Sequence, residues 1–135
     1  MTRRDDSDER TELKSYRDLV VWQKAMDLVV AIYRLTDSFP SHEQYGLRAQ
    51  VRNAAVSVPS NIAEGYARSH RGDYRRHLSI ARGSLAETET QLILAVRLDY
   101  LDRDATLAAW DLAQEVGKML GSLLRSLSDN RNTPT

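Results

Sequence analysis

A proline stands in the middle of a stretch with helical periodicity. From residue 50 to 65 the chain reads Gln-Val-Arg-Asn-Ala-Ala-Val-Ser-Val-Pro-Ser-Asn-Ile-Ala-Glu-Gly. Its apolar residues recur at the spacing that lines one face of an α-helix: Val51, Ala54, Ala55, Val58 and Ile62. Pro59 has no N–H to donate to the Ala55 carbonyl, and its ring crowds the preceding turn. We expect a helix that is kinked or repaired there by nearby polar side chains, namely Ser57, Ser60 and Asn61.

The chain contains four segments with this periodicity. We expect helices from Asp18, as N-cap, to Asp37, from about Glu43 to Ala67, from Asp73, as cap, onward, and from Asp104 onward. The third segment carries on one face Leu78, Ala81, Leu85, Thr88, Leu92 and Ala95. The fourth carries Leu107, Trp110, Ala113, Val116, Leu120, Leu124 and Leu127. Strand patterns are absent from the sequence.

Short connections determine how such helices are arranged. The connections, near residues 38–42, 68–72 and 99–103, are about five residues long, which forces neighbouring helices to be antiparallel. We therefore predict an all-α fold, an antiparallel up-down-up-down four-helix bundle spanning residues 16–127. Residues 1–15 and 128–135 lack apolar periodicity and are predicted to be disordered tails.

The first and fourth segments are apolar around most of their circumference. The polar stripe of the first is Lys24, Asp27 and Arg34, and that of the fourth is Asp111, Glu115, Lys118, Ser122 and Arg125. Beside the core row of the fourth lie Ala108, Ala109, Leu112, Met119 and Leu123. A helix that is apolar nearly all round is normally buried all round, which a four-helix monomer cannot achieve. The sequence therefore predicts an oligomer, with outward residues such as Val30 and Leu123 in its contacts.

Composition limits the class of protein. The 135 residues suit one domain with its own core, and the absence of cysteine excludes a disulfide framework and thiolate chemistry. The charged first 14 residues do not resemble a signal peptide, and no segment has the roughly 20 apolar residues of a membrane span. We expect a soluble cytoplasmic protein with no membrane association.

Catalytic and metal-binding motifs are missing from the sequence. No glutamate is followed three positions later by histidine, as a di-iron bundle requires, and His42, His70 and His77 lack ligand spacing. Phosphate-binding glycine loops and a Gly-x-Ser-x-Gly elbow are also absent. We predict no metal, no cofactor and no enzymatic activity.

Arginines are concentrated in one part of the chain. Residues 48–82 contain seven arginines against Glu64 and Asp73, a surplus of five, although the net charge of the whole chain is zero. We predict a nucleic-acid-binding surface made by Arg68, Arg71, Arg75, Arg76 and Arg82, with His70 and His77 nearby and with Tyr66 and Tyr74 available for stacking on bases.

The alternative is a solvated helix surface whose charges are satisfied within the subunit. Antiparallel geometry would then place Glu64 opposite Arg75 or Arg76, and Arg52 or Asn53 opposite Glu87. For Asn61, Glu64 and Gly65 we favour packing over a functional pocket, since Gly65 permits close approach of two helices. Trp22 is likewise expected to be a core or subunit-contact anchor.

Four sequence islands resemble a known protein family. They are residues 19–28 (Leu-Val-Val-Trp-Gln-Lys-Ala-Met-Asp-Leu), Phe39-Pro40 with Glu43 and Tyr45-Gly46-Leu47, residues 55–65, and residues 80–87 (Ile-Ala-Arg-Gly-Ser-Leu-Ala-Glu). Together they resemble the four-helix-bundle proteins also called 23S ribosomal RNA intervening-sequence proteins, which include the accessory variability determinants of diversity-generating retroelements. One position departs from the family pattern: Thr88 stands where leucine is usual.

The resemblance implies a ring-like homopentamer, and it implies partners, because some relatives assist reverse transcriptases by binding both enzyme and RNA. Repetition around a ring would multiply a modest basic patch into a sizeable field, which favours RNA or DNA binding. Two hypotheses follow. The first is an oligomeric, non-enzymatic nucleic-acid-binding accessory protein; the second is a structural ring that docks a protein partner such as a reverse transcriptase without binding nucleic acid.

Overall fold

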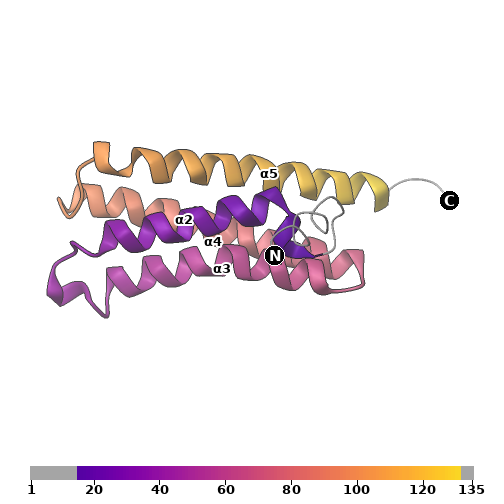
Figure 1. The fold of residues 1–135 in the computed structure, drawn as a ribbon, viewed down its shortest axis with the longest axis horizontal. Helices are drawn as coiled ribbons and strands as arrows, with labels where there is room; N and C mark the ends of the chain where they lie inside the picture. The colour runs from indigo at the N-terminus through magenta and orange to yellow at the C-terminus, as the bar shows by residue number, and fades with distance from the viewer. Residues whose placement is uncertain (1–14, 132–135) are drawn as a thin grey trace, which may run out of the picture.

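The chain folds into four long helices. The computed structural model describes residues 15–131, and the helices are α2 (Val20–Thr36), α3 (Leu47–Ala67), α4 (Arg71–Arg97) and α5 (Leu107–Arg131) (Figure 1). Three single-turn 3-10 helices precede α2, α3 and α5: η1 (Tyr16–Asp18), η2 (Ser41–Glu43) and η3 (Asp104–Thr106). Residues 15–131 contain no strand, so the all-α prediction is confirmed for that part of the chain.

The helices lie side by side along one axis. Figure 1 shows the α2–α3 and α4–α5 connections at one end of the molecule and the α3–α4 connection at the other. Because α2 and α4 each pack against both α3 and α5, α2 and α4 lie diagonally across the bundle. The arginine-rich turn between α3 and α4 is thus remote from the other two connections.

The core is built from the apolar rows that the sequence predicts in α3 and α4. All five apolar residues of the proline-containing stretch are buried, and so are the six residues of the α4 row, including Thr88. In α5, Ala113, Val116, Leu120 and Leu124 are buried, whereas Trp110 and Leu127 are half-buried.

The first turn of α5 departs from the predicted row. Leu107 was expected in the core and is 48% exposed, while Thr106 and Ala109 take the buried positions. The reason is the spacing itself: Leu107 is nine residues before Val116, which places it on the opposite side of an α-helix, whereas Ala109 is seven residues before Val116 and lies on the same side.

The helix starts also differ from the predicted caps. Asp18 belongs to η1, where its carboxylate accepts the Ser15 N–H, and α2 begins only at Val20. Asp73 lies inside the first turn of α4, which begins at Arg71, and Asp104 lies in η3. These acidic side chains still stand near helix N-termini, where the helix dipole favours them.

Glu43 is not the first residue of the second helix but caps it from outside. It ends η2, and its Oε1 atom accepts the backbone N–H of Leu47, the first residue of α3, at 2.8 Å. At the other end of the chain, α5 continues to Arg131, four residues into the predicted C-terminal tail. The rest of that tail, and residues 1–14 of the N-terminal one, lie outside the described residues.

Helix α3 is continuous through Pro59, and Asn61 and Ser57, two of the three polar residues expected to bond there, form local hydrogen bonds. The Asn61 side-chain amide donates to the Ser57 carbonyl at 2.9 Å and to Ser57 Oγ at 3.0 Å. Ser57 Oγ in turn lies 2.8 Å from Ser84 Oγ of α4, which links the two helices beside the proline. Ser60 points outward and is exposed. A kink at Pro59 stays a prediction.

Candidate nucleic-acid interface

The five predicted arginines all lie on α4 or at its junction with α3. Arg68 and Arg71 flank the α3–α4 connection, Arg75 and Arg76 follow in the first two turns of α4, and Arg82 lies further along the same helix. Four of them are exposed, and Arg75 is half-buried. The five arginines are thus close in space mainly because they are close in sequence, on either side of the α3–α4 connection.

Arg68 is the one member of this set that the subunit neutralises. Its Nη2 atom donates to Glu64 Oε2 at 2.8 Å, one turn earlier on α3. Within residues 15–128, whose side chains are described, no carboxylate pairs with the other four arginines. The Nε atom of Arg75 is also buried without a hydrogen-bond acceptor. The turn thus presents uncompensated positive charge.

The arginines of α4 do not share a single face. Arg71, Arg75 and Arg82 are spaced four and seven positions apart, so they form a row along one side of the helix. Arg76 is one position beyond Arg75, which rotates it about 100° around the axis. An extended polyanion could contact the row along α4, and Arg76 would meet a different part of that polyanion or a second strand.

Glu64 does not pair with Arg75 or Arg76, contrary to the expected alternative. Its partners are Arg68 and His77, whose Nε2 atom is 3.5 Å away. The hydrogen bond from Arg68, followed by the charge interaction with His77, lowers the pKa of Glu64 below its usual value. This carboxylate therefore stays ionised and satisfies Arg68 rather than the α4 arginines.

The aromatic and histidine side chains near the turn are less accessible than predicted. Tyr66 and Tyr74 are half-buried and contact each other edge to face, with ring centroids 5.9 Å apart. Burial, followed by the interaction with Tyr66, raises the pKa of Tyr74. His77 is buried, with Nδ1 2.9 Å from the Asp73 carbonyl, whereas His70 is exposed. Of these four side chains, only that of His70 is exposed enough to contact a phosphate or a base.

The arginines at the start of α3 have a different role. Arg52 donates to Thr36 Oγ1 at 2.8 Å and to Asp37 Oδ1 at 3.0 Å, and its guanidinium lies 4.4 Å from the centre of the Tyr33 ring. Arg48 also bonds Asp37. Of the two residues expected opposite Glu87, Asn53 is the one that lies there, since both line a polar pocket between α3 and α4. Arg52 is instead bonded to Thr36 and Asp37, at the end of α2.

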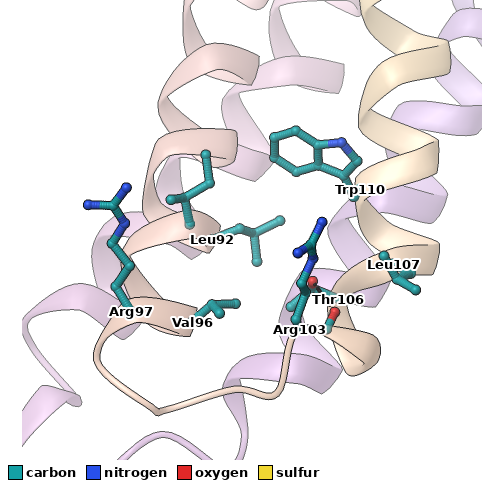
Figure 2. Close-up of a pocket in the computed structure, with 8 residues that line it drawn as sticks. Leu92, Val96, Arg97, Arg103, Thr106, Leu107 and Trp110 are labelled. Atoms are coloured by element: carbon teal, nitrogen blue, oxygen red, sulfur yellow. Dashed lines mark hydrogen bonds between the residues drawn. The ribbon is translucent and has the colours of Figure 1, made fainter.

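An apolar pocket that the sequence does not reveal lies between the end of α4 and the start of α5. Figure 2 shows Leu92 and Val96 of α4 facing Trp110 of α5, with Arg103 of the connection beside them. The signal that the sequence offers is the spacing of Leu107, which places this residue on the side of α5 opposite the core residue Val116.

The described residues contain no group of three or more histidine, cysteine, aspartate or glutamate side chains that could hold a metal ion. Over the same part of the chain, no helix combines the length and the apolar character needed to cross a membrane.

Comparisons with known proteins agree with the resemblance seen in the sequence. A family model described as 23S rRNA-intervening sequence protein matches residues 17–122. A solved structure from Bacteroides thetaiotaomicron VPI-5482, a protein of unknown function from the S23 ribosomal protein family, superposes with a TM-score of 0.70 at 26% identity. The match covers 78% of this chain and 98% of that one. A search of curated proteins finds no match.

Proposed function

The chain belongs to the 23S rRNA-intervening sequence protein family, and we propose that it is a non-enzymatic accessory protein that binds RNA or DNA through the arginines of α4. The observation that carries the proposal is the contrast between two groups of arginines. Arg48, Arg52 and Arg68 are satisfied by carboxylates of the same subunit. Arg71, Arg75, Arg76 and Arg82 have no such partner among the described side chains, and a polyphosphate backbone would supply one.

The same proposal includes assembly of the up-down-up-down bundle into a cyclic homo-oligomer, with five copies as the family resemblance implies. Two groups of exposed apolar residues support it. The α2 stripe is Met26, Val30 and Tyr33, exposed by 40%, 46% and 41%. The α4 group is Ile80 and Leu94, exposed by 41% and 42%, with Leu98 just after the helix, exposed by 45%; the polar residues Ser84, Glu87 and Gln91 lie between them on the same side.

The α2 stripe and the α4 group come from two different helices, which are diagonal in the bundle. A contact between the α2 stripe of one copy and the α4 group of the next would be heterologous, and a heterologous contact closes into a ring when its rotation permits. Every subunit of such a ring would then contribute one arginine row from its α4.

The proposal is tested by the salt dependence of binding. We expect wild-type protein to bind single-stranded or structured RNA, or DNA, with affinity that falls steeply as salt rises. Replacing Arg71, Arg75 and Arg76 together by alanine should weaken binding across sequences. The logarithmic salt slope should fall by about 2 to 3, at about 0.7 to 0.9 per lost phosphate contact. Arg68→Ala and Arg82→Ala should each have a smaller effect.

A matched control removes the same charge from the other end of the bundle. Arg34, Arg97 and Arg103 are also exposed, and their triple alanine variant should keep the wild-type salt slope. Light scattering should show the same oligomer for both variants. If wild-type protein shows no salt-sensitive binding to any of these nucleic acids, the alternative remains: a ring that docks a protein partner such as a reverse transcriptase.

A further inference from the structure

The pocket between α4 and α5 has aliphatic walls and a basic mouth. Its volume is about 370 Å³, within the range of ligand-binding cavities. Leu92, Ile93 and Val96 of α4 form one wall, and Leu107 and Trp110 of α5 form the other. Ile93 and Leu107 are 46% and 48% exposed, so the pocket opens to solvent between two apolar lips.

The charged residues that line this pocket are both cationic. Arg97 ends α4, and Arg103 lies in the connection to α5. Figure 2 shows the Arg103 side chain extending along the pocket toward Trp110, while Arg97 stands on the outer side of α4. No carboxylate within the described side chains pairs with either arginine. The connection contains Asp99, Asp102 and Asp104, but none of them lines the pocket.

The mouth of the pocket is held in place by the backbone around it. Thr106 is buried and donates its hydroxyl to the Arg103 carbonyl at 2.7 Å, which fixes the turn from which the Arg103 side chain extends. The N–H of Tyr100 bonds the Ala95 carbonyl at 2.9 Å, and Asp99 takes a left-handed conformation with φ 61°, so α4 ends sharply beneath the pocket. The guanidinium of Arg103 therefore extends from a turn whose backbone is held by hydrogen bonds.

We propose that this pocket binds an amphipathic anion, an aliphatic chain with a carboxylate head. The chain would lie between the α4 and α5 walls, where it removes exposed leucine, isoleucine and valine surface from water. The carboxylate would take the planar guanidinium of Arg103, with Arg97 as a second and more distant cation. This site lies at the opposite end of the bundle from the arginine row of α4, and the inference does not depend on nucleic-acid binding.

The test uses the full chain and octanoate as the probe. The protein contains two tryptophans, so the Trp22→Phe variant reports the pocket through Trp110 fluorescence alone. We expect octanoate to change that fluorescence saturably, at one site per chain. Octan-1-ol has the same chain without the charge and should bind about tenfold or more weakly, because a hydrogen-bonded ion pair is lost.

Variants separate the two parts of the site. Arg103→Ala should lower octanoate affinity to the level of octan-1-ol and leave octan-1-ol binding unchanged. Ile93→Glu, at an exposed lip, should abolish binding of both, while Arg34→Ala, which removes a cation from α2, should change neither. The proposal would be overturned by equal affinity for octanoate and octan-1-ol, or by an unchanged octanoate affinity in Arg103→Ala. It would also be overturned if octanoate bound only after the oligomer dissociates, because the pocket would then be a subunit contact.

Discussion

Gly65 shows how a single residue allows α3 and α4 to approach each other. A Cβ atom at this position would lie 2.7 Å from the Cβ of His77 and 3.1 Å from the Tyr74 ring, which is too close for either neighbour to accommodate without moving. The contact also keeps His77 buried beside Glu64. Gly65 is therefore required by the packing at the α3–α4 end rather than by a left-handed backbone. The sequence-based preference for packing over a functional pocket at this residue is confirmed.

We expect Gly65→Ala to lower the free energy of unfolding by about 1–3 kcal/mol, as overpacking of a tight contact does. Gly83→Ala is the matched control, because a Cβ there meets nothing within 4 Å and the residue lies inside α4. That change should instead raise stability by about 0.5–1 kcal/mol through helix propensity. Urea unfolding of both variants measures the change in the free energy of unfolding. A change of the same sign in both variants would contradict this explanation.

At the scale of the helices, the sequence predicts the elements well and their starts poorly. Apolar spacing identifies the buried faces of α3 and α4 because it depends only on the period of the helix. Asp18 and Asp73 were expected to be caps and Asp104 to begin its helix, yet 3-10 turns or an earlier helix start take these places. The cap of α3 is Glu43, which acts across a turn and could not be found by N-cap spacing.

Glu43 also connects the two loops at its end of the bundle. Besides the Leu47 N–H, it accepts the hydroxyl of Tyr100, from the α4–α5 connection, at 2.8 Å. The Leu47 bond, and then the Tyr100 bond, lower the pKa of Glu43 below its usual value of 4.5. Because the folded pKa is the lower one, this group stabilises the fold above about pH 4.5, and the contribution is lost as the pH falls through the folded pKa.

We expect Glu43→Gln to be less stable than wild type at neutral pH, with the difference shrinking as the pH is lowered beyond 4.5. Tyr100→Phe should show a smaller loss over the same pH range, since only one of the two bonds is removed. Urea unfolding across a pH series measures both. Glu87→Gln, at an exposed carboxylate of α4, serves as the control. A stability difference for Glu43→Gln that is constant with pH would refute the assignment.

At the scale of the whole molecule, the sequence predicts which residues are charged and exposed but not which of them pair. The arginines of the candidate interface were expected at the surface, and Arg71, Arg76 and Arg82 are exposed. The pairing of Arg52 with Asp37 depends on the path of the α2–α3 connection, which helix periodicity does not specify. The same limit applies to the pocket of Figure 2, because its walls come from two helices and their connection, whose packing helix periodicity does not specify.

The exposed apolar residues of α5 are fewer than the sequence suggests. Leu112, Met119 and Leu123 are half-buried against the core, and Ala109 belongs to it. Leu123→Glu would therefore damage the subunit itself, and Val30, which is 46% exposed on α2, is the better probe of assembly. The exposed Ile80 and Leu94 of α4, absent from the sequence-based expectation, are candidates for the second surface of a heterologous contact.

We expect Val30→Glu to dissociate the oligomer, because a carboxylate buried in the contact between the α2 stripe and the α4 group would lack a partner and cost several kcal/mol. Light scattering should then report the mass of one chain, 15.3 kDa, where wild type reports a multiple of it. Leu107→Glu is the control, since Leu107 is similarly exposed at 48% but lines the pocket between α4 and α5 and belongs to neither the α2 stripe nor the α4 group. It should keep the wild-type mass. A wild-type protein that is monomeric at micromolar concentration would leave the α2 stripe and the α4 group without a role in assembly and would remove the repetition on which the arginine surface depends.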